Sequence, residues 1–80
     1  MTADERREFL KVVLAHERTV AICEACAETT RDLAAEVKRG GVPQRQQLTD
    51  TITEAENVLQ DLRGVRQELT RLKALLGVRG

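Results

Sequence analysis

Aromatic residues are almost absent from this 80-residue sequence, since Phe9 is the only one and there is no Tyr or Trp. The chain therefore has almost no aromatic surface on which nucleic-acid bases could stack. A net charge is absent too, because 13 basic residues balance 13 acidic ones. Nucleic-acid-binding domains usually carry a basic excess. We therefore expect no nucleic-acid partner and a core built from small and aliphatic side chains.

Long apolar runs are also missing. Runs such as residues 12–15 are far shorter than the ~18 apolar residues of a membrane-spanning helix. Acidic residues surround Arg6 and Arg7, which is not the pattern of a secretory signal peptide. We expect no membrane association, a cytoplasmic location and reduced cysteines, since disulfides are rare in that compartment.

The sequence offers little material for catalysis. It has no glycine-rich phosphate loop and no nucleophile motif. His16 is the only histidine, and no paired carboxylates or nucleophile accompany it for acid–base chemistry. We expect a protein that is not an enzyme and that needs no cofactor.

Proline and glycine strongly interrupt the helical pattern at one place within the sequence, the segment Gly-Gly-Val-Pro at residues 40–43. We expect Gly40 and Gly41 to adopt the positive φ of a helix C-terminus, and Pro43 to lie in the first turn of the next helix. The prediction is a single domain over residues 1–80, with a helix at 3–39, a turn at 40–42 and a helix at 43–76.

The segment before this turn has the pattern of one long helix. Thr2 and Glu5 fit a capping box. Apolar and small residues then follow with the alternating spacing of four and three that a coiled-coil seam requires. The members of this seam are Phe9, Val13, His16, Val20, Cys23, Ala27, Thr30, Ala34 and Val37. A second stripe beside it consists of Val12, Thr19, Ile22, Cys26 and Leu33.

The segment after the turn repeats the pattern, with Leu48, Ile52, Ala55, Val58, Leu62, Val65, Leu69, Leu72 and Leu76. Gly64 lies inside it, where it could kink the helix, break it into two, or allow another backbone to approach. Gly77 reads as the C-terminal stop. Two helices of similar length and a short connection predict an all-α, coiled-coil-like antiparallel hairpin. A scaffold this small needs a partner or dimerisation to complete its core.

An apolar strip near the open end is the first candidate binding surface. Residues 9–14 hold only one charge and are apolar almost all round. We expect Phe9 and Val13 to face the second helix, and Leu10 and Leu14 to face a helical partner.

Charged residues supply a second candidate surface. Glu24, Glu28, Asp32 and Glu36 follow one another at a spacing of four residues, which places like charges on one helix face. This stripe is either a solvated face or a docking surface for a basic partner. Arg63, Arg66 and Lys73 form a basic strip on the second helix, either solvated or facing an acidic partner.

Cys23 and Cys26 form a CxxC motif with His16 seven residues upstream. A zinc site is disfavoured because seven residues of helix separate these side chains by roughly 10.5 Å. A redox motif usually has its first cysteine at a helix N-terminus, whereas both cysteines are expected mid-helix. We interpret them as small buried core residues, and metal or redox sensing remains the alternative.

The turn region carries a family resemblance. Residues 36–47, Glu-Val-Lys-Arg-Gly-Gly-Val-Pro-Gln-Arg-Gln-Gln, and residues 55–59, Ala-Glu-Asn-Val-Leu, resemble the small needle-subunit co-chaperones of bacterial type III secretion, the YscE and PscE type. The resemblance covers roughly residues 30–60. It implies a cytoplasmic helical hairpin that pairs with a tetratricopeptide-like chaperone to hold the needle subunit before export. The alternative is a homodimeric four-helix-bundle adaptor with no export role.

Overall fold

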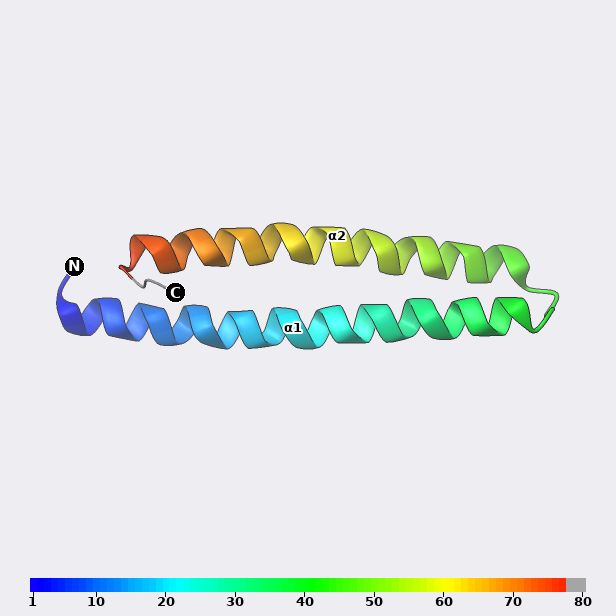
Figure 1. Ribbon diagram of the computed structural model, residues 1–80, viewed down its shortest axis with the longest axis horizontal. Helices are drawn as coiled ribbons and strands as arrows, with labels where there is room; N and C mark the ends of the chain where they lie inside the picture. Colours follow the sequence, from blue (N-terminus) through cyan, green and yellow to red (C-terminus); the bar gives the residue numbers. More distant parts are fainter. Residues whose placement is uncertain (78–80) are drawn as a thin grey trace.

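The computed structural model describes residues 1–77, and residues 78–80 of the predicted domain lie outside this range. The described chain forms two helices, α1 (Ala3–Arg39) and α2 (Arg45–Leu75). Figure 1 shows them side by side and antiparallel, with the start of α1 beside the end of α2 and the turn at the far end. The hairpin measures 59 × 17 × 15 Å. The expected all-α hairpin is confirmed.

The start of α1 is fixed by its first residues, as the sequence predicts. The Glu5 amide donates to Thr2 Oγ1 at 3.1 Å, and the Thr2 amide donates to Glu5 Oε1 at 3.2 Å. This reciprocal capping box satisfies two amides that a bare helix end would leave unpaired.

The turn departs from the prediction at one glycine. Gly41 has a φ of +79° as expected, but Gly40 has a φ of −69° and continues the helical geometry. Its amide donates to the carbonyls of Glu36 and Val37, and the Gly41 amide donates to Lys38 O at 3.2 Å. The prediction for Gly40 was wrong because one left-handed residue just after the cap is enough to reverse the chain.

The second helix begins two residues later than predicted, at Arg45. Pro43 therefore lies in the turn and not in the first turn of the helix. Gln44 occupies the cap position, and its carbonyl accepts the first helical bond from the Leu48 amide at 3.1 Å. At the other end α2 finishes at Leu75, one residue before the predicted end, and Gly77 ends the helical path with a φ of +80°.

Gly64 does not break α2, and no other part of this chain packs closely against it. The helix runs through it as one element. A Cβ atom placed on Gly64 would meet no atom within 4 Å. The three-helix alternative was therefore wrong, and no backbone of this chain makes the close approach that Gly64 would allow.

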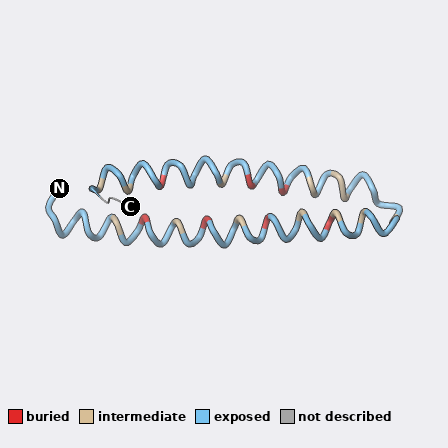
Figure 2. The backbone as a smooth tube through the Cα atoms, viewed as in Figure 1, coloured by how far each residue is buried: buried red, intermediate tan, exposed pale blue. Residues whose placement is uncertain are grey.

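The core is a single row of side chains along the contact between the helices, visible in Figure 2 as buried positions facing one another. Its members are Val13, Val20, Ala27 and Ala34 of α1 and Ala55, Leu59 and Leu69 of α2. The α1 members are spaced by seven residues, so they represent one of the two seam positions of the predicted heptad. Even Leu59, the most buried of them, is 5% exposed.

The surface area shows how thin this core is. The chain exposes 6197 Å², whereas a compact protein of its mass, 8.9 kDa, exposes about 4,800 Å² by the usual scaling of area with mass. The hairpin therefore leaves roughly 1,400 Å² more surface in water than a compact fold would.

Candidate functional site: an open apolar face

One long side of the hairpin is apolar and uncovered. The other half of the predicted α1 seam lies here: Phe9, His16, Cys23, Thr30 and Val37 are all exposed. Residues of α2 with the same heptad spacing accompany them, namely Thr51, Val58, Val65 and Leu72. Equal seven-residue spacing keeps each set on one side of its helix. We call this surface the open face.

Two hollows lie along the open face. One has a volume of 540 Å³ and lies toward the turn, where Cys23, Cys26 and Thr30 meet Thr51 and Val58. The second, of 400 Å³, lies toward the open end, where Phe9, Val12 and Val13 meet Leu72, Leu75 and Leu76. Both hollows are lined mainly by carbon, which is typical of sites that receive apolar groups.

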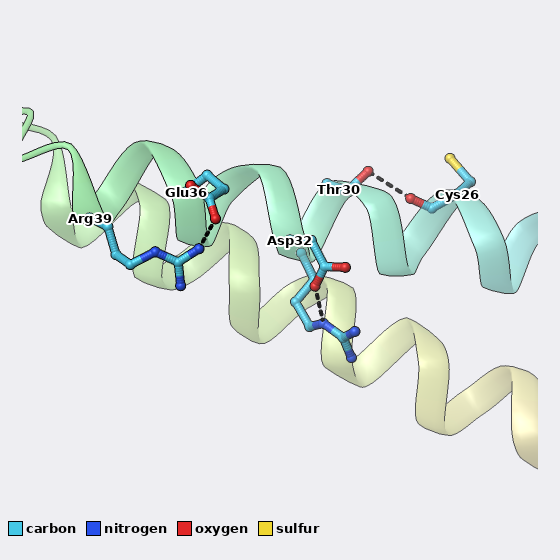
Figure 3. A network of polar contacts seen from close by, with 6 residues as sticks. Cys26, Thr30, Asp32, Glu36 and Arg39 are labelled. Carbon is cyan, nitrogen blue, oxygen red and sulfur yellow. Dashed lines mark hydrogen bonds and ion pairs between the residues drawn. The ribbon is translucent and has the colours of Figure 1, made fainter.

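Large side chains on the open face are about half in water: Phe9 is 52% exposed, Val65 46% and Leu72 46%. The threonines there do not make it polar, because their hydroxyls bond within their own helices. Thr30 Oγ1 donates to Cys26 O at 2.9 Å (Figure 3), and Thr51 Oγ1 donates to Gln47 O at 3.0 Å. Each methyl group is left available for apolar contact.

The opposite flank of the hairpin is polar, and two ion pairs join the helices there. It also holds a hollow of 530 Å³, lined mainly by polar and charged residues. Lys73 Nζ lies 3.2 Å from Glu17 Oε1, and the Arg66 guanidinium pairs with the Glu24 carboxylate. The pKa of Arg66 is raised above its ordinary value, first by the hydrogen bond that it donates to Glu24 and then by the charge of that carboxylate. The sequence pattern pointed to Glu24, Arg66 and Lys73, but as surfaces that are solvated or meet separate partners, and it did not point to Glu17.

The predicted acidic stripe is divided by these and other contacts. Glu24 bonds to Arg66, and its side chain is only 19% exposed. Asp32 accepts from Arg31 Nε at 3.1 Å, and Glu36 pairs with Arg39, as Figure 3 shows. Of the four acids, Glu28 alone takes part in no ion pair within residues 1–77. The stripe is therefore largely neutralised within the chain.

The predicted apolar strip is also distributed differently. Val13 faces α2 as expected and is 7% exposed, so it offers no surface to a partner. Phe9 was expected to face α2 but belongs to the open face. Leu10 is partly buried and lies seven residues before Glu17, on the ion-pair flank. Leu14 is 44% exposed and lines neither hollow.

The exposure of the two cysteines differs from the prediction. Both are free and exposed, whereas the sequence interpretation buried them in the core. Cys23 belongs to the half of the seam that α2 leaves uncovered, and Cys26 belongs to the second stripe beside it. His16 is exposed too, and its Nδ1 lies 2.9 Å from Val12 O. Among residues 1–77, no three side chains of metal-binding type cluster together.

Three acidic residues on α2 escaped the sequence interpretation. Glu54, Asp61 and Glu68 are spaced by seven residues, and each lies three residues after an open-face residue of α2. Residues three apart are neighbours on a helix surface, so the three acids lie along the α2 side of the open face. We call them the acidic edge. Their common spacing was the signal, but its meaning depended on knowing which side of α2 is uncovered.

Comparisons with known proteins add no relative. No protein-family model, curated protein or solved structure matches the chain. Across the described residues, neither helix combines the length and the apolar character needed to cross a membrane.

Proposed function

We propose that this protein is a non-enzymatic interaction module whose open face binds a helical segment of another polypeptide. The observation that carries the proposal is that large apolar side chains of the open face are about half exposed, at Phe9 and Val37 on α1 and at Val58, Val65 and Leu72 on α2. Exposed apolar patches of this extent usually mark interaction surfaces. The hairpin supplies two helices of a bundle, and the partner supplies the helix that covers the open face.

The solvent-exposed surface area of the hairpin supports this proposal. The excess of roughly 1,400 Å² over a compact fold is larger than the ~800 Å² that each partner contributes to a protein interface of standard size. One docked helix would therefore cover a large part of this excess.

The resemblance of the turn region gives the proposal a specific form. In that form the protein is a cytoplasmic co-chaperone that pairs with a tetratricopeptide-like chaperone and holds a type III secretion needle subunit before export. The support is the short turn with glycine after a basic residue, the glutamines at Gln44, Gln46 and Gln47 that open α2, and a hairpin with one uncovered side.

A second candidate function uses the same surface differently. The open face could be covered by a second hairpin, giving a homodimeric four-helix-bundle adaptor with no export role. The observation in its favour is that two hairpins have the four helices that such a bundle requires.

The proposed function is tested by co-purification with the candidate chaperone and needle subunit, together with sedimentation equilibrium of the protein alone. Leu72→Ser should abolish the complex and leave helix content unchanged. Leu14→Ser is the matched control, because Leu14 is equally exposed but lines neither hollow, and it should bind normally. Equal behaviour of the two variants would contradict binding through the open face, and a dimer in the absence of any partner would favour the adaptor.

A further inference from the structure

The two sides of the open face differ in charge. The α2 side carries the acidic edge, Glu54, Asp61 and Glu68. Glu54 lines the hollow near the turn. Leu75, which continues the same seven-residue series, lines the hollow near the open end. The series therefore follows the open face along its length.

The α1 side has no matching cations. The positions three residues after its exposed seam residues are Val12, Thr19, Cys26 and Leu33. Among the described residues, Glu54 and Asp61 form no ion pair. Glu68 pairs at 2.7 Å with Arg71, three residues along the same helix. The negative charge of this edge is thus not balanced across the open face.

This difference in charge between the α1 and α2 sides indicates what kind of helix would fit the open face. An occupying helix needs an apolar stripe for the hollows, basic residues on the flank that meets α2, and an uncharged flank that meets α1. The carboxylates recur every seven residues, or about 10.5 Å of helix. Cations at i, i+7 and i+14 of an occupying helix would meet all three, which sets a length of about three heptads.

A second copy of the chain fits this description poorly. If two open faces met with their turns at opposite ends, α2 would stack on its symmetry mate and Asp61 would face Asp61. If the turns were together, the acidic edge would face Thr19, Cys26 and Leu33, which carry no charge. In the first arrangement like charges brought together oppose binding, and in the second the carboxylates would lose water without gaining a cation.

The distribution of charge between the two halves of the hairpin favours pairing with a second copy, but only weakly. Residues 22–60 carry seven acids and four bases, and the remainder carries six acids and nine bases. Turns at opposite ends would therefore bring halves of opposite charge together. That attraction acts over longer distances and is screened beyond ~10 Å at 0.1 M salt, so the directly facing carboxylates decide the outcome.

We propose that the occupant of the open face is a single amphipathic helix from another protein, about three heptads long, with basic residues along the flank that contacts Glu54, Asp61 and Glu68. This inference rests on the proposed function and specifies the chemistry of the partner. The acidic edge selects the partner and sets which flank of its helix turns toward α2, and the apolar hollows supply the affinity.

The test uses three synthetic 21-residue helical peptides with identical apolar stripes, carrying Lys, Ser or Glu at i, i+7 and i+14 of one flank. Binding to the full chain is measured by fluorescence anisotropy at low and high salt. The Lys peptide should bind about tenfold more tightly than the Ser peptide, as three exposed ion pairs would give. High salt should remove that advantage.

A triple variant, Glu54→Gln, Asp61→Asn and Glu68→Gln, should bind the Lys and Ser peptides equally. Glu28→Gln and Glu56→Gln, which remove exposed acids elsewhere, should keep the preference for Lys. Equal binding of all three peptides by the unaltered chain would overturn the basic-flank inference and leave the proposed function standing. No binding by any peptide would overturn both, and self-association at micromolar concentration would assign the open face to a second copy.

Discussion

Glu24 on α1 is ion-paired with Arg66 on α2, and the pair between Glu17 and Lys73 repeats the same contact one heptad further toward the open end. Both pairs lie on the flank opposite the open face. They join the two helices in the antiparallel arrangement, and they leave the open face uncovered.

Reversing one charge of the first pair should destabilise the hairpin, and reversing both should restore it. Glu24→Lys places a cation beside Arg66 and should lower the melting temperature, and Arg66→Glu added to it should recover most of the loss. The raised pKa of Arg66 means that the contribution of its positive charge is present throughout the physiological range and is lost as the pH rises through that pKa. Glu28→Lys is the control, and an equal loss there would show that Glu24 has no special partner.

The second pair lends itself to a double-mutant cycle. Glu17→Gln and Lys73→Met, alone and together, should give a coupling energy of about 0.5–1 kcal/mol, as expected of a partly exposed ion pair. Urea denaturation followed by circular dichroism measures it. A coupling energy near zero would mean that the contact at 3.2 Å does not contribute to the register.

The thin core predicts a sharp contrast between two leucines of α2. Leu69 packs with Val13 and Val20 and is 7% exposed, whereas Leu75 is 81% exposed. Leu69→Ala should cost about 2–3 kcal/mol of unfolding free energy, and Leu75→Ala less than about 0.5 kcal/mol. Similar costs at both sites would contradict the placement of the core.

Gly64 and Gly41 should respond in opposite directions to alanine. Gly64→Ala should stabilise the protein by about 0.5–1 kcal/mol, because the added methyl group meets no atom and helix propensity improves. Gly41→Ala should destabilise it by about 1–2 kcal/mol, because an L side chain at positive φ is strained. A destabilised Gly64→Ala variant would reveal a contact at that position.

The exposed cysteines should react freely and contribute little to the fold. Both should be modified by a thiol reagent in the native protein, and the double change to Ala should leave the melting temperature almost unchanged. Slow modification of the native protein would restore the buried interpretation. Stoichiometric zinc in the purified protein, lost in the double variant, would favour metal sensing.

The sequence predicted the hairpin because its local signals agree with one another. The capping box at Thr2, the glycines at 40 and 41 and the heptads on either side each depend on neighbouring residues alone. The wrong predictions, for the φ of Gly40 and for the place of Pro43, each concern one or two residues. Several turn geometries are compatible with the same amino acids there.

The sequence could not show which half of the seam is buried. Val13 and Phe9 look equally suited to the core, and the choice depends on how α2 rotates and slides against α1. The ion pairs from Glu17 and Glu24 help to set that alignment, and they turn Phe9 and Cys23 toward solvent. The acidic edge was missed for the same reason.

The central claim is that the open face is the binding surface, and mapping amide chemical-shift changes by NMR during titration with the Lys-flanked peptide tests it most directly. The account predicts changes concentrated at Phe9, Cys23, Val58, Val65 and Leu72, with little change around Glu17, Glu24, Arg66 and Lys73. Changes concentrated on the ion-pair flank, or spread evenly over both flanks, would contradict it.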